Sequence, residues 1–354
     1  MIKTLNISAF KSLKKSSIKL PALTLLCGLN NSGKSSVIQT LRMFCNSAYG
    51  DSPLLAGHGP VEELRSKLVD PREPLKIICE FEDGMSHSLI IDDTEFEKPK
   101  YAPLSCYISA DRWGPKISLP LDRHVGKFPT IGDHGEYVIG FLDELRNQIV
   151  PEILRKDESQ GVTLEYQLVS WLKEIAPDIN ISYSRDSKRD SSHVEFNSFR
   201  PTNVGFGLSY CLPILASILG MASTKPSSGW EYSWGHEWEK HKTTYGVLLM
   251  IENPEAHLHP SGQTALGNLI ALGARSGLQI VVETQSDHLM DGIRIAVKEK
   301  LISPDNVAFH YLSRNSEGET IIETPKLNDS GKLEFWPKGF FDQTLKNRTK
   351  LARA

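Results

Sequence analysis

The sequence predicts an α/β fold, and three observations support this prediction. A mostly apolar run, 23–27, is followed by the glycine-rich stretch Gly28–Ser36 and then by apolar residues at helical spacing. An apolar run, 247–251, and a strand-like segment, 279–282, also end in polar clusters. Ligands of open α/β sheets bind at the carboxyl ends of the strands. The three clusters are therefore expected to contribute to one site.

The first cluster has the spacing of a phosphate-binding P-loop, because Gly28–Ser36 reads G-x-x-x-x-G-K-S-S. Two glycines let successive backbone N–H groups curl around phosphate oxygens. Lys34 supplies positive charge for the β- and γ-phosphates, and Ser35 supplies a hydroxyl for Mg²⁺. The alternative is a chance Gly/Ser turn, which the flanking strand and helix disfavour. The motif predicts a nucleotide site formed by Gly28, Asn30, Asn31, Ser32, Gly33, Lys34, Ser35 and Ser36.

Composition narrows the class of protein. A chain of 354 residues with 40% hydrophobic residues can form one large domain or two smaller ones. The net charge of −3 gives no global signal for nucleic acid. Five scattered cysteines without a C-x-x-C pair favour reduced thiols and a cytoplasmic location. We expect neither a targeting segment, because Pro21 interrupts the N-terminal apolar run, nor a membrane span.

The remaining segments predict the other elements. Apolar alternation predicts two strands within 1–20 and a hairpin within 75–93 that turns at Asp83-Gly84. Helical spacing predicts a mostly helical segment over 136–175. Further elements are a short strand over 107–110, a hairpin spanning 179–196, and an apolar helix that runs to Met221.

A P-loop needs a carboxylate from a second strand, which anchors Mg²⁺ through its water shell. Glu252 is the first acid after the purely apolar run 247–251, so we predict that it has this role. The alternative is an acidic residue that caps a loop.

With these motifs, the sequence resembles ABC-type ATPase heads, in the OLD-like and RecF/SMC-like branch of AAA ATPases. The segments that carry the resemblance are Gly28–Ser36, Asn203–Ser209, Glu252–Pro260 and Glu283–His288, in that order. Phe10-Lys11-Ser12 and the tail 336–342 (WPKGFFD) resemble one compact bacterial group in that branch, often linked to phage defence.

The resemblance implies one ATPase domain over residues 1–354, with a mixed central sheet, an antiparallel edge sheet and a helical lid. It divides into a P-loop lobe with the edge sheet over 1–133, the lid over 134–178, and a lobe over 179–354 that holds the signature motif, the Walker B strand and the tail. ATP and Mg²⁺ are the implied cofactors. No nuclease domain with clustered acids is evident.

The resemblance also implies a homodimer, or a higher homo-oligomer, joined through shared ATP sites. Asn203–Ser209 matches the signature motif that contacts the γ-phosphate bound to the opposite subunit, with Gly207 and Ser209 at the contact. An ordinary glycine-rich helix start is the alternative. His257 and His259 fall in the D-loop, and His288 follows the next strand, so we prefer these roles to a metal site.

A loop that senses Mg²⁺ is implied for 107–115, and Asp111 and Arg112 are the candidates. A salt-bridged turn is the alternative reading of this loop.

Two residues depart from the pattern of active ATPase heads, and both departures weaken ATP hydrolysis. Asn253 stands where active heads carry a glutamate that polarises water, and Gln285 stands at the switch position that is usually histidine. Glu255 could supply the missing carboxylate. Because loss of a general base typically costs about 10²–10⁴ in rate, we expect slow hydrolysis. The candidate catalytic residues are Glu252, Asn253, Glu255 and Gln285.

Three functions stay open. The first is a sensor or regulatory subunit for a separately encoded effector, plausibly in antiphage defence. The second is a RecF-like DNA-binding repair ATPase, which the net charge does not support. The third is a structural scaffold. An insert over 225–245 could bind the effector through Trp230, Trp234 and Trp238, although self-packing is the alternative and Gly235 argues against a stable isolated helix.

Overall fold

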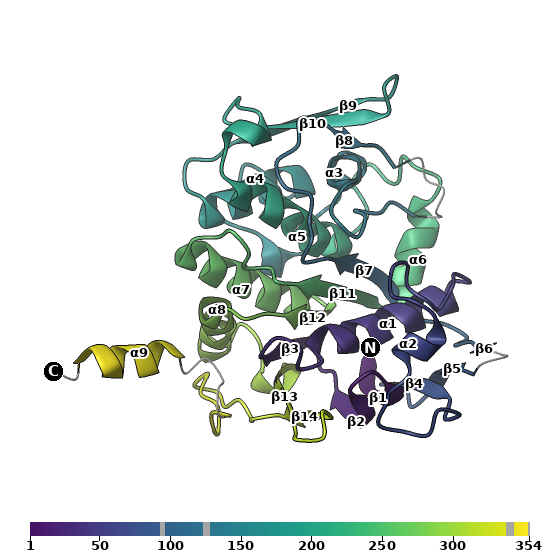
Figure 1. Ribbon diagram of the computed structural model, residues 1–354. Coiled ribbons are helices and arrows are strands. Elements are labelled where there is room, and N and C mark those ends of the chain that lie inside the picture. The colour runs from purple at the N-terminus through teal and green to yellow at the C-terminus, as the bar shows by residue number, and fades with distance from the viewer. Residues whose placement is uncertain (93–95, 123–127, 338–342, 353–354) are drawn as a thin grey trace. The chain divides into compact units, whose positions relative to one another are not determined.

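The chain forms two compact units, and the computed structural model describes residues 1–92, 96–122, 128–337 and 343–352 (Figure 1). The first unit comprises Met1–Pro103, Val281–Asp287 and Ser303–Ala354, and the second comprises Leu104–Ile280 and His288–Ile302. Residues 338–342 of the tail that supported the resemblance lie outside the described part. Because the chain leaves and re-enters each unit, segments far apart in sequence become neighbours.

The first unit contains an antiparallel sheet in the order β2-β1-β4-β5-β6. Its strands are β1 (Ile2–Phe10), β2 (Leu13–Lys19), β4 (Leu75–Phe81), β5 (Ser86–Ile91) and β6 (Phe96–Glu97). Side chains along β4 alternate between buried and less buried, as expected for a strand with one covered face. Gly84, with φ of 82°, makes the turn of the predicted hairpin. The expected antiparallel sheet is confirmed.

The P-loop strand belongs to a mixed sheet, in which β14, β13, β3 and β12 follow one another. These strands are β3 (Leu23–Gly28), β12 (Gln279–Glu283), β13 (Val307–Arg314) and β14 (Thr320–Glu323). β13 runs parallel to β3 and antiparallel to β14. The first five residues of β3 are buried, which explains why its run is nearly all apolar. The predicted fold class, an α/β P-loop NTPase with a mixed sheet, is confirmed.

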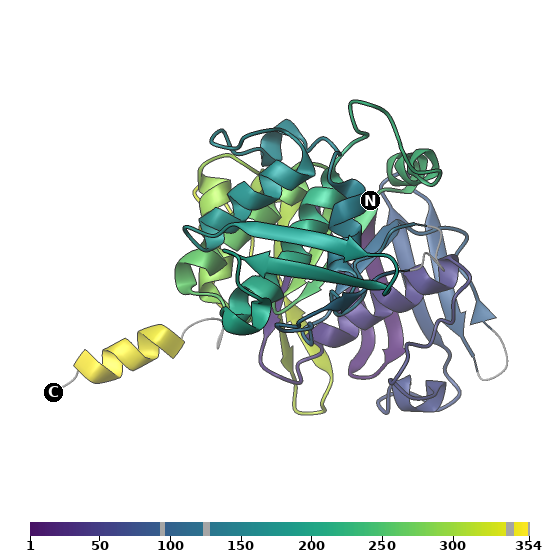
Figure 2. The same cartoon turned by 90° about the horizontal axis from the view of Figure 1, so that it is seen from above.

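The second unit combines a parallel strand pair, a small antiparallel sheet and most of the helices. The pair is β7 (Leu104–Ile108) with β11 (Val247–Glu252). The small sheet has the order β8-β10-β9, with β8 (Leu119–Pro120), β9 (Ile181–Asp186) and β10 (Ser191–Phe196). Figure 2 shows β9 and β10 side by side in opposite directions, as the predicted hairpin requires.

The long helices of the chain are α1 (Lys34–Ala48), α3 (Val138–Leu145), α4 (Leu164–Ile175), α5 (Phe206–Ala222), α6 (Gly235–Tyr245), α7 (Pro260–Arg275), α8 (Asp287–Lys298) and α9 (Gln343–Ala352). The short helical turns are α2 (Val61–Leu64), η1 (Glu152–Leu154), η2 (Pro201–Asn203) and η3 (Pro304–Asn306). In the second unit α5 is the central helix, because α3, α4 and α7 all contact it. No described helix is long and apolar enough to cross a membrane.

α6 is a formed helix that begins at Gly235 itself, although glycine and polar residues disfavour an isolated helix here. The Trp230 ring lies so close that a Cβ on Gly235 would be 2.2 Å from it. Trp238, one turn into the helix, is 1% exposed. Tertiary packing against tryptophan therefore stabilises a helix that glycine and polar residues would disfavour in isolation.

Candidate functional site

The P-loop adopts a curled backbone that its glycines permit. Gly28 and Gly33 have φ of 141° and 105°, and Asn31 has φ of 63°. A Cβ on Gly28 would lie 2.2 Å from the carbonyl oxygen of Leu312 on β13. Both the dihedral angle and this close approach therefore require glycine at position 28.

Lys34 is held inside the curl, with only 3% of its surface exposed. Its Nζ donates to the carbonyl oxygens of Gly28 and Leu29, at 2.9 and 3.0 Å. Among the described residues, no side chain caps the helix α1 that begins at Lys34. The backbone N–H groups of its first turn therefore remain available for phosphate oxygens, next to a fixed positive charge.

Glu283, at the end of β12, contacts both functional side chains of the P-loop. The hydroxyl of Ser35 donates to its Oε2 at 2.7 Å, and Nζ of Lys34 lies 3.6 Å from its Oε1. Glu283 is 7% exposed. Sequence reasoning placed this residue in a polar cluster but did not select it. The signal that was available is the position of the acid directly after the apolar residues 280–282.

Side chains from two further segments fix the outer part of the loop. Nε2 of Gln285 donates to Oδ1 of Asn30 at 2.8 Å, which brings the predicted switch residue to the P-loop. Nη2 of Arg314 donates to Oδ1 of Asn31 at 3.1 Å. Sequence reasoning missed Arg314, because no motif marks it and it lies far from the P-loop in sequence.

Thr320, the first residue of β14, ties three distant segments together. Its hydroxyl donates to the carbonyl oxygen of Ser32 at 2.9 Å and lies 2.8 Å from Oγ of Ser12. Its N–H donates to the carbonyl oxygen of Ser12 at 2.8 Å. A Cβ on Gly33 would lie 2.6 Å from the threonine hydroxyl oxygen. The shape of the phosphate loop therefore depends on β14 as well as on the loop itself.

In the second unit, Arg112 fixes the backbone that follows β11. Nη1 donates to the carbonyl oxygen of Glu252 and Nη2 to that of Asn253, both at 2.7 Å. Asn253 is in the left-handed region, with φ of 43°. Burial lowers the pKa of Arg112, and the nearby carboxylate of Glu255 opposes this shift. The proposed Mg²⁺ sensor Arg112 thus positions the turn that carries Glu252 and Asn253.

The predicted signature segment contacts the predicted D-loop within the second unit. α5 begins at Phe206, and a Cβ on Gly207 would lie 2.6 Å from the carbonyl oxygen of His257. The His257 ring lies 4.6 Å from the Tyr210 ring, between centroids. Ser209 lies on the first turn of α5 and is half-buried. Gly207 is therefore needed for close packing inside one chain, in addition to any role toward phosphate.

The histidines have structural contacts. The His257 ring packs edge-on against the Tyr210 ring, and Nδ1 of His259 accepts from the N–H of Ser261, which caps α7. The described residues contain no group of three or more His, Cys, Asp or Glu side chains arranged to hold a metal. The roles of these histidines in loops of the fold remain predictions.

The structure groups the predicted site residues into two sets. In the first unit the P-loop residues lie with Gln285, and with the unpredicted Glu283. In the second unit Glu252, Asn253 and Glu255 lie on one turn, and Gly207 and Ser209 lie on α5. The role of Glu252 in anchoring Mg²⁺ stays a prediction.

The tryptophan insert forms a cluster that packs on itself. The Trp234 and Trp238 rings are 5.7 Å apart between centroids, and Trp230 lies 5.7 and 6.0 Å from them. Trp238 is buried, whereas Trp230 and Trp234 are partly exposed. Only the latter two can therefore contribute to a surface for a partner.

Lys242 of α6 lies against the same cluster. Its Nζ is 4.2 Å from the centroid of the Trp238 ring and donates to the carbonyl oxygen of Ser223 at 2.7 Å. Burial lowers the pKa of the Lys242 ammonium to about 7, and the Glu239 carboxylate opposes part of the shift. A cation–π contact and one hydrogen bond therefore only partly compensate for the loss of water.

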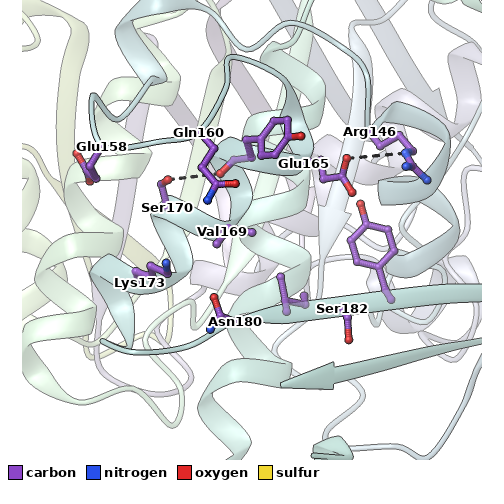
Figure 3. A pocket seen from close by; sticks show the side chains of 12 residues that line it. Arg146, Glu158, Gln160, Glu165, Val169, Ser170, Lys173, Asn180 and Ser182 are labelled. Carbon is purple, nitrogen blue, oxygen red and sulfur yellow. Dashed lines mark hydrogen bonds and ion pairs between the residues drawn. The ribbon is translucent and has the colours of Figure 1, made fainter. Parts of the chain in front are cut away.

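A pocket of about 450 Å³ lies in the second unit between α4 and β9 (Figure 3). Arg146 and Glu165 form an ion pair at its edge, with 3.9 Å between Nε and Oε2. Burial raises the pKa of the Tyr183 phenol, whose hydroxyl has no hydrogen-bond partner among the described residues. None of the predicted site residues lines this pocket.

Residues 23–291 match the model of the family described as "AAA domain, putative AbiEii toxin, Type IV TA system". The chain belongs to this AAA family. Residues 302–351 match a second family model, described as a protein of unknown function, DUF3696. No curated protein matches the chain. The P-loop and the match to the AAA family together identify the chain as a P-loop ATPase.

Three solved structures that are similar to this AAA-family chain are SMC heads. An SMC head bound to the C-winged helix domain of ScpA is 14% identical to this chain and has a TM-score of 0.48. The match covers 93% of this chain and 98% of the SMC head chain. The SMC head from Thermotoga maritima is 13% identical, with 92% and 99% covered and a TM-score of 0.46. An SMC head with an extended coiled coil, bound to the C-terminal domain of ScpA derived from Pyrococcus furiosus, is 12% identical, with 99% and 99% covered and a TM-score of 0.47. The family assignment rests on the sequence match.

Proposed function

We propose that the chain binds ATP with Mg²⁺, hydrolyses it slowly, and uses nucleotide occupancy as a switch. The observation that carries the proposal is the closed P-loop, in which Lys34 is buried and held by two loop carbonyl oxygens. A lysine fixed in this way meets the β- and γ-phosphates without first being ordered, which favours binding.

Slow turnover follows from the residues at two positions. Asn253 lacks the basicity of a carboxylate, so it can orient water but cannot accept its proton. Gln285 donates its amide to Asn30, and an amide carries no positive charge toward phosphate. Glu255, on the same turn as Asn253, is the carboxylate that we assign to the remaining catalysis.

We propose that two chains associate head to tail and share two ATP sites. In each site Lys34 and Ser35 act on the phosphates from one chain, and Gly207 and Ser209 act from the other. Ser209 on the first turn of α5 supports this role, because N–H groups and hydroxyls at a helix start suit an anion. A symmetric dimer then contains two equivalent sites, and nucleotide binding changes its geometry.

The regulated effector is a separately encoded protein, and the OLD-like, antiphage context is the setting that we propose. The family description names a putative toxin of a type IV toxin–antitoxin system, which supports a two-component arrangement. Trp230 and Trp234, with Tyr232 stacked on Trp234 at 5.4 Å, form the surface proposed for the effector. All five cysteines are free, which supports a cytoplasmic location.

Nucleotide binding is tested by titrating ATP into the purified chain with excess Mg²⁺. Replacing Lys34 by Ala should weaken ATP binding by about 10- to 100-fold, since charge-assisted hydrogen bonds contribute roughly 1.5–3 kcal/mol. Lys14→Ala, an exposed change on β2 of the same unit, is the matched control and should bind normally. Equal affinity of the Lys34→Ala chain and the parent chain would refute the assignment of the P-loop.

A further inference from the structure

We propose that Glu283 is the carboxylate that binds Mg²⁺ beside Ser35 when the chain holds ATP. This inference rests on the proposed ATP binding and deepens it by naming a metal-binding residue within the P-loop unit.

The carboxylate of Glu283 lies beside the hydroxyl of the P-loop serine. Oε2 of Glu283 accepts a hydrogen bond from the Ser35 hydroxyl at 2.7 Å. The hydroxyl at this position of a P-loop is the one that coordinates Mg²⁺. A carboxylate in contact with that hydroxyl is within reach of the same ion, either directly or through one coordinated water.

The backbone around Glu283 holds this residue in place. The N–H of Thr284 donates to the carbonyl oxygen of Leu26 at 3.2 Å, which joins the end of β12 to the P-loop strand. Thr284 is fully buried, and its Oγ1 accepts from the N–H of Ser286 at 3.0 Å. Glu283 therefore projects from a rigid strand end, as a preorganised ligand should.

The charge of Glu283 also favours a divalent cation at this position. Glu283 is 7% exposed, and without nucleotide the Lys34 ammonium at 3.6 Å partly compensates its charge. A bound triphosphate would compete for that lysine and would place negative charge next to the carboxylate, which is costly at a buried site. A divalent cation removes this conflict. Glu283 should therefore oppose metal-free ATP and favour ATP bound with Mg²⁺.

The donor set also fits the metal. Mg²⁺ prefers oxygen ligands and usually takes only one or two protein carboxylates, with phosphates and waters in the other positions. Ser35 and Glu283 supply one hydroxyl and one carboxylate, which are both oxygen ligands. The pair therefore leaves the other positions of the ion to phosphate oxygens and water.

The test measures ATP affinity with a metal chelator and with excess Mg²⁺, in the parent chain and in Glu283→Gln. The glutamine keeps the shape and removes the charge. We expect Glu283→Gln to bind metal-free ATP more tightly than the parent chain, and to lose about 10- to 100-fold of the gain in affinity that Mg²⁺ provides. Glu323→Gln, an exposed change on β14 of the same unit, should behave as the parent chain.

Two more measurements separate charge from placement. Glu283→Asp keeps the charge but retracts it, so metal-free ATP should bind as weakly as in the parent chain while the gain from Mg²⁺ falls. Mn²⁺ titrated with ATP and followed by electron paramagnetic resonance should bind less tightly to both variants. An unchanged gain from Mg²⁺ in Glu283→Gln would overturn this inference alone. A parent chain that binds no ATP would overturn both proposals.

Discussion

Gly28 combines two constraints that most turn glycines do not share. Its φ of 141° lies outside the range that residues with a side chain ordinarily adopt, and a Cβ added there would lie 2.2 Å from the carbonyl oxygen of Leu312. Gly84 in the hairpin turn has φ of 82°, but a Cβ added there would meet no atom within 4 Å. The two glycines therefore separate the effect of the dihedral angle from that of close packing.

We expect Gly28→Ala to lower the free energy of unfolding by about 3 kcal/mol or more, because dihedral strain and a backbone clash add. Gly84→Ala should cost about 1 kcal/mol from the dihedral angle alone. Urea unfolding followed by circular dichroism measures both. Equal losses in the two variants would show that the approach to Leu312 relaxes freely.

At the same scale, the sequence predicts the P-loop residues better than their partners. Gly28, Lys34 and Ser35 follow from local spacing, since each motif residue lies within one short segment. Glu283 and Arg314 contact that segment across more than two hundred residues, and only the folded chain brings them together. An acid after an apolar strand is a hint of such contacts, but it does not identify which strand end meets the serine.

Among the elements, those with local signals were predictable and α6 was not. β3 and β11 follow from uninterrupted buried runs, and the hairpin of β4 and β5 follows from alternation with a glycine turn. α6 depends on the tryptophan cluster, whose rings contact one another at the start of the helix. Packing between side chains, rather than propensity, decides this helix.

The free energy of unfolding should depend on pH through α6, because Lys242 has a pKa of about 7 in the folded chain and an ordinary value of 10.5. Between these values the unfolded chain binds more protons, so stability should rise with pH by at most about 1.4 kcal/mol per unit. Below about pH 7 both states are protonated and the full cost of burying the charge applies. Lys242→Met should remove this rise.

The measurement is urea unfolding of the two chains at a series of pH values from about 6 to about 10, which covers most of the window between the folded pKa of about 7 and the ordinary value of 10.5. Lys240→Met, on a neighbouring position of the same helix that is not buried, is the matched control. Parallel profiles for Lys242→Met and the parent chain would contradict the burial of the ammonium.

For the whole molecule, the proposed sharing of ATP sites predicts that mixing two inactive variants restores part of the ATP turnover. Lys34→Ala removes the lysine from one side of a site, and Ser209→Arg blocks the other side. A mixed dimer of the two variants contains one site with both defects and one without any. An equal mixture should therefore recover about a quarter of the parent turnover, since half of the dimers are mixed and each holds one intact site.

Turnover is measured as phosphate release at equal total protein. The control mixes Lys34→Ala with a chain that carries both changes, so that no intact site can form and no recovery is expected. If the first mixture does no better than the sum of its parts, each chain completes its own site and the head-to-tail arrangement is wrong.

Because of Thr320, the phosphate loop depends on a part of the chain that is synthesised later. The phosphate loop is synthesised before β14, so the carbonyl oxygen of Ser32 has no Thr320 hydroxyl to accept from until that later segment is made. β3 likewise lacks β13, its parallel neighbour on one side, until Val307–Arg314 has been synthesised. A nascent chain should therefore be unable to hold nucleotide until β13 and β14 are present, so the order of synthesis delays the proposed switch.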